Sequence, residues 1–348
     1  MIRSHRPQPK EARPVNTAAW PITQGQGIHV VGLNPSMDRT EEVPGFQLHQ
    51  VNRSQQTRPR AGGKSFIVAR ALRRLGVDVA AHGFLGGAVG SYLREECHRL
   101  GIRDLHTGIA GETRINTIVV DPGSGSATVI NEPGPEVSGK EFEQLRATLV
   151  DSLTPGSLVA FTGSLPQGVE AQRYTELIAE CSRNGTHTLV DAAETTLVEV
   201  AGRGPWAIKC NLEEFSALDS AVDPVWSEAR LPELVAAMRR TLRSGTRLVL
   251  VTLGPGGLVA VTEDEVVRVH TAPIVVQNPT GSGDTLLAGL LAAAHRGTSL
   301  HEALELGSAA AAANAATITP DIGPDPDLNP YRAGIRLSVI EQRRPTDV

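Results

Sequence analysis

Short apolar runs alternate with helical patterns from residue 28 onward, and this alternation constrains the fold more than any other feature of the sequence. Residues 28–33 and 158–161 have the length and composition of buried strands, whereas residues 66–75 repeat apolar side chains at helical spacing. Strands separated by helices form βαβ units, in which neighbouring strands are parallel. The sequence therefore predicts an α/β domain built on a mainly parallel sheet.

The same alternation continues along the chain. It predicts strands at residues 77–81, 188–190, 206–209 and 247–251, and helices at 89–100, about 172–183, 231–243, 285–296 and 300–316. We assign residues 27–330 to one domain, preceded by a flexible, proline-rich extension at 1–26 that lies outside the fold, and followed by a C-terminal tail at 331–348.

Two stretches interrupt this rhythm, at about residues 40–60 and 112–132. Turn residues and β-favouring residues dominate both stretches, as in the loop Asp121-Pro-Gly-Ser-Gly. These stretches predict a small β-sheet outside the main sheet. It is either a lid over a site or a pair of edge hairpins without that role.

The composition excludes several classes of protein. Lys and Arg total 33 against 38 Asp and Glu, for a net charge of −5, so no strong positive field is available for nucleic acid. The apolar runs are too short to span a membrane, and no apolar stretch near the N-terminus indicates a signal peptide. The three cysteines show no Cys-x-x-Cys spacing, which fits a reducing cytoplasm.

Polar residues and glycines follow nearly every predicted strand. In open α/β sheets, ligands bind beyond the carboxyl ends of the strands, so these residues are expected to gather at one edge. They form a candidate phosphate-handling crevice, made of residues 34–38, 162–166, 191, 209–214, 252–254 and 277–284.

The segment Gly281-Ser282-Gly283-Asp284 is the most informative part of this set. It is expected to follow an apolar strand that ends at Val276, and it opens the helix at 285–296. Glycines let several backbone N–H groups converge, and the first turn of a helix adds free donors that favour an anion. Asp284 is either a helix N-cap or a general base beside a bound phosphate.

A second glycine cluster, Gly62-Gly63-Lys64, also precedes a helix. It is not a P-loop, because Arg58 occupies the position of the first P-loop glycine. Lys64, Arg53 and Arg114 are candidate phosphate contacts, and the alternative for each is a solvated surface side chain.

Taken in order, the motifs resemble the ribokinase-like (PfkB) sugar kinases, in the 1-phosphofructokinase and tagatose-6-phosphate kinase branch. The resemblance covers about residues 28–325. It rests on Asn34-Pro-Ser-Met-Asp38, Val51-Asn-Arg53, Ala61-Gly-Gly-Lys64, Gly111-Glu-Thr-Arg114-Ile-Asn116, Asn131-Glu-Pro-Gly134, Gly163-Ser-Leu-Pro166, Asn211-Leu-Glu-Glu214 and Gly281-Ser-Gly-Asp284.

The resemblance implies a three-layer αβα fold with a β-sheet lid, a homodimer formed through that lid, and magnesium-dependent phosphoryl transfer from ATP to a sugar phosphate. Asp284 would be the catalytic base, and Gly281, Ser282 and Gly283 would hold the transferring group. The implied acceptor contacts are Asp38, Arg53, Gly62, Gly63, Lys64, Arg114 and Asn116. The implied nucleotide contacts are Lys209, Asn211, Thr252, Gly254 and Asn314, with Asn211 and Glu214 near magnesium.

The chain departs from the family pattern at several positions, among them Ser65, which replaces a glycine of Gly-Gly-Lys-Gly, and Cys210, which replaces a common proline. Ile67 stands where an asparagine normally faces the sugar, and Arg60 stands where an acid often precedes Ala-Gly-Gly. Fructose 1-phosphate is the first acceptor that the sequence suggests, with tagatose 6-phosphate or fructose 6-phosphate as alternatives. An unphosphorylated acceptor and a non-catalytic phosphosugar-binding protein are the other hypotheses.

Overall fold

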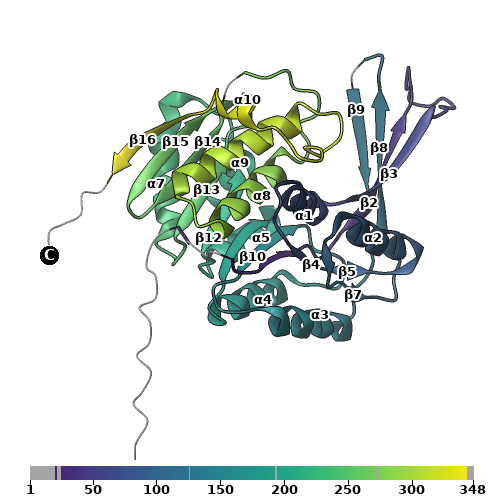
Figure 1. Cartoon of the computed structure of the whole chain (residues 1–348), viewed down its shortest axis with the longest axis horizontal. Helices are drawn as coiled ribbons and strands as arrows, with labels where there is room; N and C mark the ends of the chain where they lie inside the picture. Colours follow the sequence, from purple (N-terminus) through teal and green to yellow (C-terminus); the bar gives the residue numbers. More distant parts are fainter. Residues whose placement is uncertain (1–19, 22–24, 125, 193, 272, 343–348) are drawn as a thin grey trace, which may run out of the picture.

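The computed structural model describes residues 20–21, 25–124, 126–192, 194–271 and 273–342 (Figure 1). Its central sheet has ten strands in the order β16-β15-β14-β13-β12-β11-β10-β1-β4-β6. The strands from β13 to β6 pair in parallel, and β14, β15 and β16 extend the sheet in antiparallel fashion. These strands are β1 (Ile28–Val31), β4 (Ala80–His82), β6 (Arg103–Asp104), β10 (Leu158–Gly163), β11 (His187–Ala192), β12 (Ala207–Asn211), β13 (Leu248–Thr252), β14 (Leu258–Thr262), β15 (Glu265–His270) and β16 (Arg336–Gln342).

Helices cover both faces of this sheet, because its central strands are apolar on both sides. Val30 packs into the core under α1, α8 and α9, whereas the next residue, Val31, packs into the core against α3 and α4. Figure 1 shows the resulting three layers. The helices are α1 (Lys64–Arg74), α2 (Gly87–Leu100), α3 (Gly139–Ser152), α4 (Ala171–Arg183), α5 (Glu194–Ala201), α6 (Leu212–Leu218), α7 (Leu231–Leu242), α8 (Ser282–His295), α9 (Leu300–Ala315) and α10 (Asn329–Arg332), with 3-10 turns at Glu228–Arg230 and Gly254–Gly256.

A separate four-stranded sheet projects from the end of the domain beside α1 and α2 (Figure 1). Two antiparallel hairpins, β2–β3 and β8–β9, are joined by parallel pairing of β2 with β8, which places Asp38 beside Asn116. We refer to this sheet as the lid. Its strands are β2 (Ser36–Glu42), β3 (Gln56–Gly62), β8 (Arg114–Asp121) and β9 (Ser126–Asn131), while β5 (Phe84–Leu85) and β7 (Thr107–Gly108) form a small pair of their own.

The predicted α/β class and the small separate sheet are confirmed, but the expected strand before Gly281 is wrong. Residues 273–276 form no strand, and Val275 and Val276 are 83% and 52% exposed. An apolar run alone does not distinguish a buried strand from an exposed loop when no neighbouring strand is available to pair with it.

The described part of the N-terminal extension is not outside the fold. Trp20 is buried, its Nε1 donates to the Thr298 carbonyl at 2.9 Å, and its ring lies 5.9 Å from that of Trp206. One aromatic side chain in a proline-rich segment gives no periodicity from which burial could be predicted. Residues 1–19, assigned to the same extension, lie outside the described residues.

Part of the predicted C-terminal tail pairs with the central sheet as β16. Most residues of β16 are exposed, and its apolar alternation, Leu337 and Val339, is too short to indicate a strand from sequence. None of the described helices is long and apolar enough to cross a membrane.

Helix α8 is held against α9 by direct contact between two glycines. A Cβ on Gly289 would lie 2.5 Å from the Cα of Gly307, closer than packed atoms can approach. Gly289→Ala is therefore expected to lower the free energy of unfolding by about 1–3 kcal/mol, although alanine favours an isolated helix by about 1 kcal/mol.

Urea denaturation measures this effect. The matched control is Gly108→Ala, where a Cβ would have no neighbour within 4 Å, and its expected change is below about 0.5 kcal/mol. A Gly289→Ala protein at least as stable as the parent contradicts the packing described for α8.

Candidate active site

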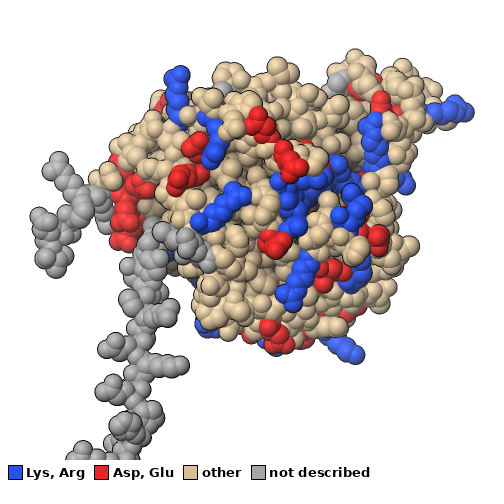
Figure 2. Space-filling model, viewed as in Figure 1, with Lys and Arg blue, Asp and Glu red and all other residues tan. Residues whose placement is uncertain are grey.

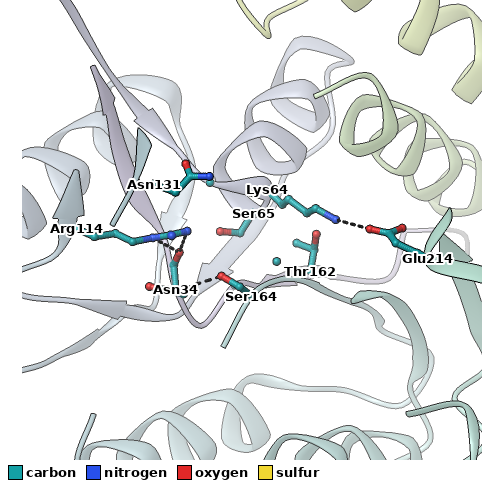
Figure 3. A pocket seen from close by; sticks show the side chains of 11 residues that line it. Asn34, Lys64, Ser65, Arg114, Asn131, Thr162, Ser164 and Glu214 are labelled. Carbon is teal, nitrogen blue, oxygen red and sulfur yellow. Dashed lines mark hydrogen bonds and ion pairs between the residues drawn. The ribbon is translucent and has the colours of Figure 1, made fainter. Parts of the chain in front are cut away.

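A cavity of about 290 Å³ opens at the carboxyl ends of β1 and β10, where the lid meets the central sheet. Figure 3 shows side chains entering it from separate parts of the chain: Arg114 from the lid, Lys64 from the start of α1, Ser164 after β10 and Glu214 from α6. The sheet edge predicted from sequence to collect polar residues is therefore the edge that carries the cavity.

The glycine segment predicted as an anion cradle forms the first turn of α8. Gly281, with a φ of 77°, precedes the helix in a left-handed conformation that suits glycine, and a Cβ there would lie 2.9 Å from the Pro320 side chain. Buried Asn314 donates from Nδ2 to the Thr280 carbonyl at 2.8 Å and to Ser282 Oγ at 3.2 Å. These contacts fix the turn whose free N–H groups can bind an anion.

Asp284 lies in this first turn and is almost completely buried. Burial and the nearby Asp191 carboxylate raise the pKa of Asp284 to about 7, while the ammonium groups of Lys64 and Lys209 oppose that shift. A carboxyl group with this pKa gains and loses its proton near neutral pH, which is the property required of a general base.

Asp191, at the end of β11, holds two ammonium groups beside Asp284. One of its carboxylate oxygens lies 2.7 Å from Lys209 Nζ and the other lies 3.2 Å from Lys64 Nζ. Burial favours the neutral form of Asp191, but the two lysines outweigh this and lower its pKa. A Cβ on Gly283 would lie 3.0 Å from Lys209 Nζ, so that ammonium group faces the turn at the start of α8.

Lys64 lines the cavity together with Arg114 and also pairs with carboxylates. Its ammonium group, which we expected against the acceptor's phosphate, lies between Asp191 and Glu214, 3.9 Å from Glu214 Oε1 (Figure 3). Although burial favours the neutral amine, the carboxylates of Asp191, Asp284 and Glu214 raise the pKa of Lys64. Lys64 is therefore charged at neutral pH and lies close to the candidate base.

Asn211 and Glu214 form the capping box of α6. Asn211 Oδ1 accepts from the Glu214 N–H at 2.7 Å, and Glu214 Oε2 accepts from the Asn211 N–H at 2.8 Å. This leaves Glu214 Oε1 facing the cavity. Carboxylate and amide oxygens are the ligands that Mg²⁺ prefers, so this pair fits the ion that the sequence analysis placed here.

The lid presents Asp38 and Asn116 at its base. Asp38 Oδ1 accepts from Ser36 Oγ at 2.8 Å and from Asn116 Nδ2 at 3.0 Å. A Cβ on Gly62 would lie within 2.4 Å of the three atoms of the Asp38 carboxylate, and Gly63, with a φ of 78°, begins α1. Glycine at 62 is therefore what allows Asp38 to lie against the start of α1.

Arg114 is fixed at the lid end of the cavity by backbone carbonyls. Its Nε and Nη2 donate to the Asn34 carbonyl at 3.2 and 2.9 Å, and Nη1 donates to the Glu132 carbonyl at 2.9 Å. The Asn34 side chain donates to Ser164 Oγ at 3.3 Å, and its Oδ1 is buried without a hydrogen-bond partner among the described residues. These groups form a polar wall opposite Lys64.

Of the predicted site residues, Gly63, Lys64, Arg114 and Glu214 line this cavity. The described lining does not include Asp38, Gly62, Asn116, Lys209, Asn211, Gly281, Ser282, Gly283, Asp284 or Asn314. Arg53 lies exposed in the connection between β2 and β3 and is absent from the described lining. Thr252 and Gly254 lie at the end of β13, where Thr252 is in register with Asn211. Asn34, Ser164 and Asp191 belong to the crevice that the sequence predicted, but no individual role was predicted for them. Asn34 and Ser164 follow β1 and β10, and Asp191 is the last residue but one of β11.

Comparisons with known proteins identify the family of the chain. A model described as the pfkB family of carbohydrate kinases matches residues 26–323. The chain is 35% identical over 265 residues to a tagatose-6-phosphate kinase from Staphylococcus epidermidis, covering 76% of this chain and 84% of that relative. It superposes on phosphofructokinase-2 from Escherichia coli, solved with substrates and products, with a TM-score of 0.82 at 26% identity, covering 88% of this chain and 98% of that one.

A more distant structure supports the fold alone. Ribokinase from Thermotoga maritima superposes with a TM-score of 0.67 at 20% identity, covering 85% of this chain and 94% of that one. The ribokinase-like architecture and the kinase activity expected from the ordered motifs are thereby confirmed. Because the family model spans almost the whole described domain, the chain belongs to the pfkB family of carbohydrate kinases.

Proposed function

We propose that the protein transfers the γ-phosphoryl group of ATP to a hydroxyl of a hexose phosphate, with Mg²⁺ as cofactor. The observation that carries this proposal is Asp284, a carboxyl group with a pKa of about 7 in the first turn of α8, beside the buried ammonium groups of Lys64 and Lys209. A base, an N–H cradle and two fixed cations are the groups that phosphoryl transfer to an alcohol requires.

Each group has a distinct part in the proposed reaction. The N–H groups of Gly281, Ser282 and Gly283 hold the γ-phosphoryl oxygens, and Lys209 neutralises part of their charge. Asp284 takes the proton of the acceptor hydroxyl as the acceptor oxygen bonds to phosphorus. The bond from that phosphorus to the β-phosphate oxygen breaks, which releases ADP.

The remaining residues position the two substrates. Glu214 and Asn211 would hold Mg²⁺, which shields charge on the nucleotide phosphates when it is bound. Thr252 and Gly254 border the nucleotide, and Asn314 keeps the start of α8 in place. Asp38 and Asn116 bind acceptor hydroxyls.

Arg114 and Ser164 bind the acceptor's phosphate, because they contribute polar groups to the cavity and Arg114 lies at the end opposite Glu214 (Figure 3). The similarity to a tagatose-6-phosphate kinase supports tagatose 6-phosphate as acceptor, and the sequence motifs support fructose 1-phosphate. Both are ketohexose phosphates, as is fructose 6-phosphate. We therefore assign the acceptor to this class.

We also propose that two copies of the chain pair through their lids. Strand β9 is an edge of the lid, and its Val129 and Ile130 are 51% and 59% exposed, so a second copy could cover both the edge and these side chains. Sedimentation velocity is expected to give the mass of a dimer at micromolar concentration. A single-chain mass under those conditions contradicts the pairing.

A screen of ADP release tests the catalytic proposal. The acceptors are fructose 1-phosphate, tagatose 6-phosphate, fructose 6-phosphate and the corresponding free sugars. One or more of the phosphorylated sugars is expected to give a kcat/KM at least about 100-fold above that of any free sugar, because Arg114 and Ser164 contact only the former.

Asp284→Asn is the matched variant for this screen. It retains the size of the side chain and removes the base, so its kcat is expected to fall by about 10² to 10⁴-fold while its melting temperature stays within a few degrees of the parent's. A near-normal rate in this variant excludes Asp284 as the base. Tight phosphosugar binding without ADP formation in the parent protein would show a binding protein instead.

A further inference from the structure

A second cavity, of about 270 Å³, lies between the base of the lid, α1, α2 and the segment around Pro320. Asp38 and Ile67 line it, so it adjoins the proposed acceptor site, yet it is separate from the cavity that contains Arg114 and Lys64. Its size is close to the lower limit for sites that bind small molecules. Of its lining residues, the proposed reaction gives a role only to Asp38.

Arginine side chains dominate the charge around this cavity. Its lining includes Arg58, Arg60, Arg70 and Arg99 against the two acids Asp38 and Glu96. Figure 2 shows basic side chains gathered over the junction of α1, α2 and the lid. Because low-dielectric walls focus the field of such a cluster, the cavity attracts negative charge.

Internal partners neutralise only part of this charge. Arg58 pairs with Glu42 at 3.3 Å and Arg99 pairs with Glu96 at 2.7 Å. Arg60 and Arg74, however, share the single carboxylate of Asp321, at 3.3 and 3.1 Å. Arg70 is only 2% exposed, and its recorded hydrogen bonds go to neutral backbone carbonyls, those of Pro320 and Ala61. Burial and the charge of Arg60 lower the pKa of Arg70 to about 10.

One donor in this cluster has no acceptor. Arg60 Nη1 is buried and makes no hydrogen bond to any described residue, although Nη2 of the same side chain reaches Asp321. A buried guanidinium N–H without an acceptor costs free energy that a bound oxyanion would recover. The unpaired donor and the excess of positive charge therefore point to the same kind of ligand.

Two of the departures from the family pattern, Arg60 and Ile67, line this cavity. Arg60 adds a positive charge where an acid is usual, and Ile67 removes an amide that could bind an uncharged hydroxyl. Together the two changes convert a wall suited to sugar hydroxyls into one suited to an anion.

We propose that this second cavity binds the phosphate group of a small molecule, with Arg60 and Arg70 as its principal contacts. The phosphate lies at the arginine end, away from Asp38, whose carboxylate is held by Ser36 and Asn116. It belongs to a phosphorylated compound separate from the acceptor, or to the acceptor itself if the assignment of the acceptor's phosphate to Arg114 and Ser164 is wrong. The chemistry of recognition is the same in both cases.

Calorimetric titration with inorganic phosphate tests the site without requiring turnover. Arg60→Gln is expected to weaken phosphate binding at this site at least tenfold, because it removes a charge and a forked donor. The control is Arg39→Gln on β2, which removes the same charge from a residue that pairs with Glu41 and is absent from the described cavity lining. Phosphate binding at other places is the same in the parent, Arg60→Gln and Arg39→Gln proteins. A difference in phosphate affinity between them therefore reports on the second cavity.

Arg60→Lys keeps the test decisive if Arg60→Gln does not fold. It retains the charge beside Asp321 and loses the planar guanidinium group with its paired N–H donors. Phosphate binding is therefore expected to weaken several-fold. Thermal melts establish that each variant is folded. Phosphate binding by the folded Arg60 variants equal to that of the parent and of Arg39→Gln overturns the proposal.

Steady-state kinetics distinguish the two sources of phosphate. This kinetic experiment rests on the proposed function. If the acceptor supplies the group, Arg60→Gln raises the KM for the phosphosugar about tenfold or more with little change in kcat. If a separate compound supplies it, the KM in phosphate-free buffer is unchanged, while a response of the parent's rate to inorganic phosphate disappears in the variant. A protein inactive on every acceptor contradicts the proposed function and leaves the titration to decide the anion site.

Discussion

The carboxylate of Asp191 and the two ammonium groups paired with it are the interaction on which the site depends. Burying a lone carboxylate is costly, and Asp191 is fully buried only because Lys209 and Lys64 lie 2.7 and 3.2 Å from its two oxygens. The pairing fixes two cations beneath the start of α8. It also places a negative charge near Asp284, which helps to keep that carboxyl protonated up to about pH 7.

The rest of the fold sets the distance between this cluster and the lid. Parallel strands bring Asp191, Asn211 and Thr162 to one edge of the sheet, and contact between Gly289 and Gly307 seats α8 against α9. Asn314 then ties α9 to the turn that precedes Asp284. The lid is anchored at the same edge by Asp38, which fits against α1 only because residue 62 is glycine.

The local sequence pattern was sufficient to predict the fold class and part of the site. It was not sufficient to predict contacts between residues far apart in the chain. The alternation of strands and helices and the glycine turn at Gly281 to Asp284 are short-range features, so they can be predicted from one sequence. The role of Asn211 and Glu214 came only from the family resemblance. The direction of the Lys64 side chain depends on Asp191, which is 127 residues away in the chain. It could therefore not be predicted from local sequence. The arginine-lined cavity likewise arises from Arg60, Arg70 and Asp321, which only the tertiary structure brings together.

The pH dependence of kcat/KM for the preferred phosphosugar tests the central claim most directly, because it reports the pKa of the base in the free enzyme. Asp284 acts as a base only when it is ionised, so kcat/KM is predicted to rise with pH, with a midpoint at about 7, and to level off above it. The ionisation of the acceptor's phosphate, near pH 6, is measured separately and subtracted. A corrected profile that is flat between pH 5.5 and 9 would contradict the account, because burial and the Asp191 carboxylate would then not set the pKa of the base.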